Sequence, residues 1–589
     1  MCGIAGIFAY AEDAPQVDAA ELLRMRDRMI TRGPDGAGMW VAEDRYVGLA
    51  HRRLAIVDLS IAGAQPMASR DGHYRIVFNG EIYNFKELRE ELRQAGAVFE
   101  SNSDTEVLVQ LYAREGGAMC RRLRGMYALA IWDDIEKCLF MARDPFGIKP
   151  LYIHDDGRSL RLASQVKGLL AGGTIGRDAD PEGERAYWIW GHVPEPRTLY
   201  RGIRALTPGT WVKVHRGGQR RTEVFESVAN LIAGFDRLQS PDGVPNDREI
   251  TLRDVLLDSV RHHLIADVPV CVFLSSGIDS ATLAALAAEC GTALRTVTVG
   301  FEEYRGTASD ETVLAEQVAR RYGADHQTVW IGRHEFEDSF DAFVDSMDQP
   351  TIDGLNTWLV ARAASQLGHK VALSGLGGDE FFGGYPSFHQ IPWIRRLSGP
   401  FAAIPGLGAI IRRAGVPLLR RFTSEKYAGL LEYGATWEGA YTLRRALRMP
   451  WETPGEEWTQ ELKPVPELEG LRHPDAIVSF LEATYYMRNQ LLRDSDWAGM
   501  AHSLEVRVPL IDVHLTRHVA MHRREGRSYS KRDLAAVARP PLPSEIVRRP
   551  KTGFTVPVRE WMRTPISGVG STRGLRGWQE AIGSRFIGA

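Results

Sequence analysis

A turn-rich, polar stretch at residues 216–250 divides this 589-residue chain into two halves with different sequence patterns. A chain of this length exceeds what one hydrophobic core organises, so at least two domains are expected. In the first half, short alternating apolar segments predict strands, including a hairpin formed by segments 126–132 and 138–142. We therefore expect an α+β domain over residues 2–215 and interpret residues 216–250 as a linker.

The second half, residues 251–589, repeats a strand-then-helix pattern. Segment 268–274 is an apolar, β-branched run that predicts a buried strand, and segment 279–289 predicts the helix after it. Buried strands that alternate with helices indicate an α/β domain with a doubly wound, mainly parallel sheet. From about residue 390 onward the pattern becomes mostly helical.

Composition argues against several classes of protein. The net charge is −3 and no sustained run of Lys or Arg occurs, which argues against nucleic acid as a partner. No apolar run reaches the roughly 18 residues that a membrane span needs, so no membrane partner is expected. The five cysteines are scattered and odd in number, which favours a reducing cytoplasm over a disulfide framework.

Cys2 is the most informative single residue in the first half. Once the initiator methionine is removed, this residue carries both a thiol and a free α-amine. An α-amine has a reference pKa of about 7.7 to 8, so it can accept the thiol proton near neutral pH. Such a nucleophile needs no separate histidine as its base. Taken alone, Cys2 is equally compatible with a structural, buried cysteine.

Further motifs follow Cys2 in a fixed order: Arg-Gly-Pro-Asp at 32–35, His51 with Arg53-Leu54, Asn-Gly-Glu at 79–81, and Ser-Asp at 103–104. Taken singly, Asn-Gly is typical of a hairpin turn and Ser-Asp of a helix cap. Together with Cys-Gly-Ile-Ala-Gly at 2–6 and the Arg-Asp-Pro-Phe-Gly run at 143–147, they resemble the class II glutamine amidotransferases. These proteins are N-terminal-nucleophile hydrolases, and the resemblance implies a four-layer αββα sandwich.

The resemblance also implies roles for individual residues. It places catalysis at Cys2, Asn79 and Gly80, and it places glutamine binding at Arg53, Ile56, Asn79, Glu81 and Asp104. A guanidinium can hold the α-carboxylate of glutamine with two hydrogen bonds, and the two carboxylates can pair with its α-ammonium. The Asn79 amide and the Gly80 N–H can stabilise the oxyanion of a tetrahedral intermediate.

The loop Ser-Ser-Gly-Ile-Asp-Ser at 275–280 joins the predicted strand to the predicted helix. Small residues before a helix N-terminus present backbone N–H groups to an anion, although a capped helix alone explains the same pattern. The loop resembles the Ser-Gly-Gly-x-Asp-Ser signature of the ATP pyrophosphatases, which have an adenine nucleotide α-hydrolase-like fold. Ser276 replaces the first glycine of that signature.

A second glycine-rich loop at 374–385 follows another predicted strand, at 370–373. Loops at the carboxyl ends of parallel strands face one crevice, so both loops are expected to meet there. The resemblance implies Mg²⁺ ligands at Asp279 and Asp379, since Mg²⁺ bridges phosphates through one or two carboxylates. The ATP-binding residues implied are Leu274, Ser275, Ser276, Gly277, Asp279, Ser280, Val299, Ser374 and Gly375.

Near the C-terminus, the runs at 500–510 and 549–554 resemble the closing motifs of glutamine-hydrolysing asparagine synthetases. Lys551, in the second run, is then the cation for charge that develops during adenylation and amide formation. The resemblance covers the chain from Cys2 to about Trp561. It implies glutamine, ATP and a small carboxylate as substrates, with Mg²⁺ as cofactor, and it leaves a homodimer open.

Two departures from that family concern the acceptor. Leu376 stands where asparagine synthetases carry an acidic residue, and the segment 350–357 also differs. Aspartate, converted to asparagine through an acyl-AMP, remains the leading expectation for the acceptor. The alternatives are the same chemistry on a sugar acid or peptide, and a non-catalytic regulatory paralogue. The last alternative would predict loss of Cys2 or of the metal carboxylates, yet all are present.

Overall fold

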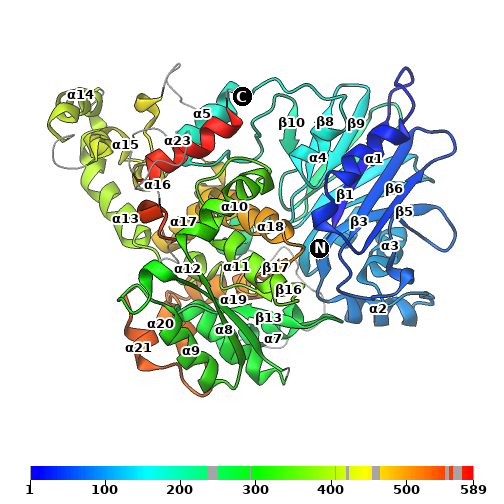
Figure 1. Cartoon of the computed structure of the whole chain (residues 1–589). Helices are drawn as coiled ribbons and strands as arrows, with labels where there is room; N and C mark the ends of the chain where they lie inside the picture. Colours follow the sequence, from blue (N-terminus) through cyan, green and yellow to red (C-terminus); the bar gives the residue numbers. More distant parts are fainter. Residues whose placement is uncertain are drawn as a thin grey trace.

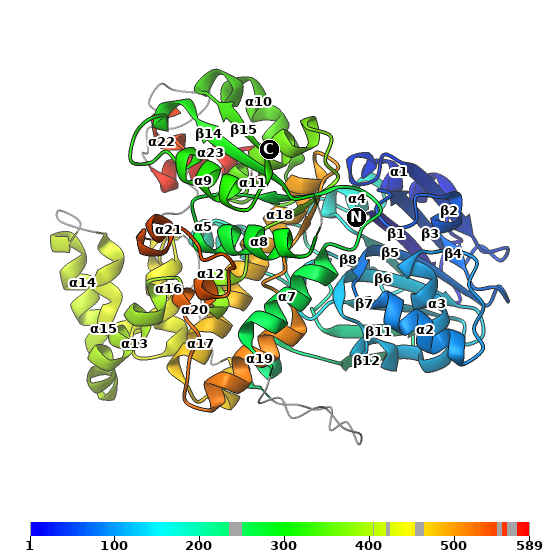
Figure 2. The same cartoon turned by 90° about the horizontal axis from the view of Figure 1, so that it is seen from below.

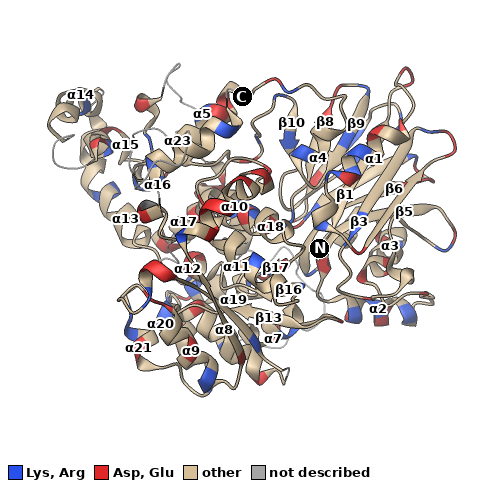
Figure 3. Cartoon of the chain, in the orientation of Figure 1, with Lys and Arg blue, Asp and Glu red and all other residues tan. Residues whose placement is uncertain are grey.

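The computed structural model describes most of the chain: residues 2–234, 250–291, 293–404, 406–419, 424–453, 465–550, 556–561 and 574–587. The first half lies at one side of the molecule and the second half at the other, with a broad contact between them (Figures 1 and 2). Acidic and basic residues are interspersed over both halves (Figure 3).

The first half contains two six-stranded antiparallel sheets packed face to face. One has the order β10-β8-β9-β1-β3-β2 and the other the order β12-β11-β7-β6-β5-β4. The strands of the first sheet are β1 Gly3–Ala9, β2 Gly36–Val41, β3 Val47–Arg53, β8 Tyr152–Asp155, β9 Ser159–Ala163 and β10 Ile203–Ala205. Those of the second are β4 Met67–Ala68, β5 Tyr74–Ile82, β6 Gly125–Asp133, β7 Cys138–Arg143, β11 Thr210–His215 and β12 Arg220–Val224.

Helices cover both outer faces of this sandwich, which confirms the αββα architecture. The first sheet carries α1 (Ala19–Asp27) and α4 (Val166–Ala171), and the second carries α2 (Phe85–Gln94) and α3 (Asp104–Glu115). Strand β1 shows why the layers form, because every one of its residues is buried. Ile4 and Phe8 pack between the two sheets, whereas Ala5 and Ile7 pack beneath the outer helices.

The predicted linker at 216–250 is wrong in its first part. Strand β12 pairs with β11 and extends the second sheet, and α6 (Val228–Ala233) then packs against α19 (Val513–Arg524) of the other half. The polar Arg-Gly-Gly run at 216–218 is the tight turn of this hairpin, with left-handed glycines at 217 and 218. Residues 235–249 lie outside the described part of the chain.

The second half is built on a five-stranded, all-parallel sheet of order β15-β14-β13-β16-β17. The strands are β13 Val270–Phe273, β14 Arg295–Phe301, β15 Asp325–Ile331, β16 Val371–Leu373 and β17 Glu505–Arg507. The strand order reverses between β13 and β16, and such a switch point opens a crevice at the carboxyl ends of the two strands. The parallel sheet was predicted, but β15 and β17 were not.

Helices cover both faces of this sheet. On one face lie α7 (Leu252–His263), α8 (Ile278–Glu289) and α9 (Thr312–Arg321); on the other lie α10 (Arg333–Ser346), α11 (Leu355–Gln366) and α18 (Arg493–Met500). The remaining helices form the predicted helical part: α12 Gly378–Phe381, α13 Ser387–Ser398, α14 Leu407–Leu419, α15 Leu430–Tyr433, α16 Trp437–Arg445, α17 Pro474–Leu481, α20 Lys531–Ala536, α21 Ser544–Arg548, α22 Val558–Trp561 and α23 Leu575–Phe586. The first half also contributes α5 (Pro181–Trp190) to the contact with this part.

Among the described residues, no single helix is long and apolar enough to cross a membrane. The bent pair formed by α13 with the short helix after it and by α14 meets that test only by combined length and composition.

Buried ion pairs join the two halves. Arg124, in the turn before β6, pairs with Asp512 at the start of α19. The distance between Arg124 Nε and Asp512 Oδ2 is 2.7 Å, and both side chains are almost fully buried. Arg32 pairs with Asp496 of α18 at 2.6 Å, again fully out of solvent. Such pairs fix orientation, because a charge that loses its partner in the interior is strongly destabilising.

We predict that Arg124→Ala lowers the free energy of unfolding by about 3 to 5 kcal/mol, because Asp512 is left buried without its cation. A shift in the urea unfolding midpoint of the full chain measures the effect. Arg70→Ala is the matched control, since Arg70 and Glu100 form an exposed pair at 3.9 Å that contributes at most about 1 kcal/mol. Equal midpoints for the two variants would contradict the structural role of Arg124.

Candidate active sites

The first candidate site lies on one edge of the sandwich, where β1 begins and where β3 and β5 end. Cys2 is the residue before β1 and is 92% shielded, with 8% of its surface exposed. Its backbone nitrogen donates a hydrogen bond to Asn79 Oδ1 at 3.0 Å. Asn79 is fully buried, and its Nδ2 donor has no partner among the described residues. An unpaired buried donor is costly, so this amide is free to stabilise an incoming oxyanion.

Gly80, next along β5, must be glycine. A Cβ at this position would collide with the main-chain carbonyl oxygen of Met126 on the neighbouring strand. The backbone beside Asn79 is therefore pressed against β6 and held in place. The structure thus brings together Cys2, Asn79 and Gly80, the residues of this half for which a catalytic role was predicted.

The other predicted residues of this site lie near the ends of β3 and β5 or in segments that follow these strands. Arg53, at the end of β3, donates to the main-chain carbonyl of Ser60 at 2.7 Å and to that of Asp58. Asp104, at the start of α3, accepts from the Ile82 N–H at 3.0 Å. Glu81 faces Arg507 of β17 in the other half, 3.5 Å away. Ile56 is a buried apolar residue whose carbonyl accepts from the Asp267 N–H.

Burial sets the charge states at this site. It raises the pKa of Asp104 to about 6 and, together with Glu505, raises the pKa of Glu81. It also raises the pKa of the Cys2 thiol, which the positive N-terminus and a hydrogen bond from the Leu54 backbone oppose. Burial lowers the pKa of His51 to about 3, so this histidine is neutral near pH 7.

The second candidate site is a cavity of about 710 Å³ at the switch point of the parallel sheet. All of the residues predicted for nucleotide and metal line it: Leu274, Ser275, Ser276, Gly277, Asp279, Ser280, Val299, Ser374, Gly375 and Asp379. The loop at 275–280 is closed by its own hydroxyls. Ser280 Oγ lies 3.0 Å from Ser275 Oγ, and the Gly277 N–H donates to Ser275 Oγ at 3.2 Å.

Glycines let the two loops of this cavity touch. A Cβ at Gly375 would lie 2.9 Å from Asp279 Cβ, and a Cβ at Gly378 would collide with the Asp279 carboxylate. In the same way, a Cβ at Gly384 would collide with the Asp379 carboxylate. The second loop therefore fits around both carboxylates only without side chains at these positions.

Asp279 and Asp379 converge on one cation, the ammonium group of Lys531. Lys531 Nζ lies 2.8 Å from Asp379 Oδ1 and is also bonded to Asp279. Two carboxylates that share one cation have the donor set and spacing that suit a divalent ion held jointly with phosphates. The residues present therefore fit Mg²⁺. Sequence analysis missed Lys531 because Ser530 and Asp533 form an ordinary helix capping box around it.

The wall of the cavity beyond the nucleotide loops carries residues that were not predicted to bind the nucleotide or the metal. It includes Leu376, Tyr385, Tyr486 and Asp353. Asp353 Oδ1 accepts from the Gly354 N–H at 3.0 Å, and among the described residues no side chain bonds to this carboxylate. Tyr486 lies in an 11-residue π-helical stretch, Glu482–Leu492, of the kind often found at functional sites. The departure of segment 350–357 from the family pattern was the available signal for Asp353.

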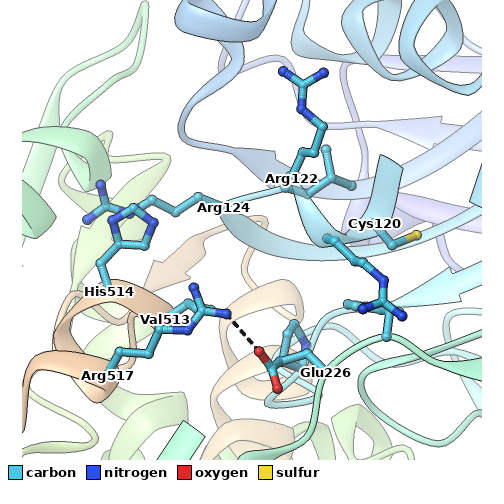
Figure 4. A pocket seen from close by; sticks show the side chains of 11 residues that line it. Cys120, Arg122, Arg124, Glu226, Val513, His514 and Arg517 are labelled. Atoms are coloured by element: carbon cyan, nitrogen blue, oxygen red, sulfur yellow. Dashed lines mark hydrogen bonds and ion pairs between the residues drawn. The ribbon is translucent and has the colours of Figure 1, made fainter. Parts of the chain in front are cut away.

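Two further features complete the picture. Lys551, predicted as a catalytic cation, lies outside the described residues, whereas Arg549 of the same motif donates to Ser276 Oγ at 2.5 Å. A small cavity of about 50 Å³ lies between the segment before β6, the segment after β12 and the start of α19 (Figure 4). Its arginines already have carboxylate partners, such as Glu226 for Arg517 at 2.7 Å, so it is part of the packing between the halves.

Comparisons with known proteins agree with this division. Residues 1–226 match the family of the glutamine amidotransferase domain, and residues 251–569 match the asparagine synthase family. A putative glutamine-hydrolysing asparagine synthetase of Mycobacterium bovis is 35% identical, over 96% of this chain and 88% of its own length. Asparagine synthetase 1 of Bacillus subtilis is 32% identical, over 96% and 89%.

A relative that is named as an amidase is similar over the same extent of the chain. Amidase chry2 of Gibberella zeae is 28% identical, over 96% of this chain and 90% of its own length. Both domain matches, and relatives above 30% identity that cover nearly the whole chain, show the family directly. The chain belongs to the asparagine synthase family and carries an N-terminal glutamine amidotransferase domain.

Proposed function

We propose that this glutamine-dependent amide synthetase transfers ammonia from glutamine at Cys2 to an acyl-AMP formed in the 710 Å³ cavity. The observation that carries the proposal is the convergence of Asp279 and Asp379 on a single cation beside the loop at 275–280. This arrangement suits the phosphates of ATP. The same chain carries Cys2, a buried cysteine that follows the initiator methionine. A non-catalytic paralogue has no reason to keep both sets of groups.

In the first half, the Cys2 sulfur attacks the side-chain amide of glutamine. After removal of residue 1, the nitrogen now held by Asn79 Oδ1 is a free amine, and it carries the thiol proton to the leaving ammonia. Asn79 Nδ2 and the Gly80 N–H stabilise the oxyanion. Arg53 holds the α-carboxylate of glutamine, Glu81 and Asp104 hold its α-ammonium, and water then releases glutamate.

In the second half, the loops at 275–280 and 374–380 hold the phosphates of ATP through backbone N–H groups and the start of α8. Mg²⁺, bound by Asp279 and Asp379, would neutralise phosphate charge as pyrophosphate leaves. The acceptor carboxylate attacks the α-phosphorus, pyrophosphate departs, and an acyl-AMP remains. Ammonia then displaces AMP, and Lys551 is proposed to balance the negative charge that develops.

The acceptor is proposed to be an acid other than aspartate. Aspartate would bring a second carboxylate into the cavity, and that group needs a cation. Among the described lining residues the cations are Lys531, Arg532 and Arg549, and two of these already contact the nucleotide loops. Asp353 is the acidic residue on the wall beyond the nucleotide loops, and burial raises the pKa of its carboxyl group. Its ionised form would repel a carboxylate, whereas it can accept a hydrogen bond from a hydroxyl or an ammonium.

Replacing Cys2 tests the division of labour. We expect Cys2→Ala to abolish amide synthesis from glutamine, because the nucleophile is gone, while synthesis from added ammonium chloride continues at near the wild-type rate. Amide product and AMP are measured with each nitrogen source. Cys138→Ala serves as control, since Cys138 lies inside β7 away from both sites. Loss of both activities in Cys2→Ala, or ADP as the nucleotide product, would overturn the proposal.

The pKa of Asp104 predicts how glutamine binding depends on pH. Because burial raises this pKa to about 6, the carboxyl group is neutral below pH 6 and cannot pair with the ammonium of glutamine. The KM for glutamine should therefore fall as pH rises from 5 to 7, by about ten-fold. Burial also raises the pKa of Glu81, so Asp104→Asn should reduce, and not abolish, the fall in KM between pH 5 and pH 7. The control Asp71→Asn, in an exposed turn, should leave this fall in KM unchanged. An unchanged fall in KM in Asp104→Asn would remove Asp104 from the glutamine site.

Pyrophosphate release tests the acceptor. β-Alanine is aspartate without its α-carboxylate. Glucuronate carries hydroxyls and has neither the α-carboxylate nor the ammonium group of aspartate. We expect the better of these two to exceed aspartate in kcat/KM at least ten-fold, and Asp353→Asn to lower that value by about 10- to 100-fold through a lost charge-assisted hydrogen bond. Asp338→Asn, on the exposed face of α10, is the control. A preference for aspartate would overturn the acceptor proposal and leave the amide synthetase intact.

A further inference from the structure

A lobe at the edge of the molecule exposes apolar side chains. It consists of α13, the short helix Gly399–Ala403 and α14, and both views place it far from the amidotransferase half (Figures 1 and 2). Seven of the nineteen exposed large apolar residues in the described part of the chain lie between positions 393 and 418. Monomeric proteins seldom gather exposed apolar residues in this way without a partner for them.

Helical spacing puts these residues on continuous faces. The lobe has two arms, the first formed by α13 with the short helix after it and the second by α14. On the first arm, Trp393, Leu397 and Phe401 follow one another at intervals of four residues, and 61% of the Trp393 surface is exposed. On the second arm, Ile411 and Leu418 are seven residues apart, beside Ile410. Residues four or seven apart share one face of a helix. Each arm thus presents an apolar stripe to solvent, and the arms meet at a bend of 120°.

The charge of the lobe has one sign. From residue 381 to residue 424 the sequence contains six arginines and no Asp, Glu or Lys, although 75 of the 589 residues of the whole chain are acidic. About one residue in eight is acidic elsewhere, so five or six acids would be usual in a segment of this length. Arg396 and Arg413 are exposed, and neither has an ion pair among the described residues. Arg412, by contrast, pairs with Glu432.

We infer that this lobe docks on an anionic lipid surface. Exposed Trp, Phe and Ile beside unpaired arginines are the combination by which amphipathic helices lie in the headgroup layer, where each basic residue gains about 1 kcal/mol from anionic lipid. A second copy of the chain is disfavoured, because a symmetric contact through the lobe would set arginine against arginine. The inference departs from the expectation of no membrane partner, and it is independent of the reaction proposed above.

The test uses the full chain and sedimentation with vesicles of pure phosphatidylcholine or of phosphatidylcholine with about a third phosphatidylglycerol. We expect binding to the anionic vesicles to be at least ten-fold stronger, and to weaken as salt is raised, because the attraction is screened. The double variant Arg396→Glu/Arg413→Glu should lose at least ten-fold in binding. Ile410→Ser should lose several-fold with the charges unchanged.

Matched controls come from the other half of the molecule. Arg201→Glu/Arg204→Glu changes two exposed arginines near β10, and Ile135→Ser changes an exposed isoleucine in a turn; both should bind as the wild type does. Glutamine hydrolysis reports that each variant is folded. Equal binding to both vesicle types, no binding to either, or unchanged binding by the double variant would overturn the inference. So would a concentration-dependent dimer that Ile410→Ser abolishes, because the lobe would then be a contact between copies.

Discussion

The buried guanidinium of Arg507 joins the two catalytic halves of this protein. Its Nε is 2.5 Å from Glu505 Oε1, its Nη1 donates to the carbonyls of His263 and Ile265, and its Nη2 faces Glu81 across the contact between the halves. None of its surface is exposed. A fully buried cation is tolerated only when acceptors surround it, so the glutamine site and the parallel sheet must keep their relative positions.

The same residue reaches the nucleotide loop through its backbone. The carbonyl of Arg507 accepts from the Ser374 N–H at 2.8 Å, at the point where the second loop leaves β16. Arg507 therefore contacts one residue of each proposed site: Glu81 through its side chain and Ser374 through its backbone carbonyl. These two contacts fix the position of the second loop relative to Glu81.

Much of this architecture could be predicted from the sequence, because local signals agreed with the global fold. The hairpin at 126–142 and the helix after the loop at 275–280 had clear apolar periodicity and turn residues, and both are present. Strand β17 escaped prediction because it is three residues long and two of them, Glu505 and Arg507, are charged. The two residues bond to each other, but the other acceptors of Arg507, the carbonyls of His263 and Ile265, lie more than 200 positions away, where no local pattern records them.

The candidate sites show the same boundary between local and long-range information. Motifs identified the proposed site residues that stand in a local sequence signature, such as Asn79, Gly80 and Ser275. They did not identify Lys531, whose position between two carboxylates follows only from the packing of α20 on α8. The start of the linker was misplaced for a related reason, since the polar face of β12 is solvent-exposed and only its pairing with β11 reveals a strand.

The glycines that fit around Asp279 and Asp379 divide the second loop into two kinds of position. At positions 375, 378 and 384 any side chain would collide with the carboxylates or with atoms beside them, so only glycine fits at these positions. Leu376, between Gly375 and Gly377, also lines the cavity, and it already carries a side chain that is partly buried against the neighbouring core. A substitution at position 376 would therefore change the lining of the cavity while the three glycines keep their fit around the two carboxylates.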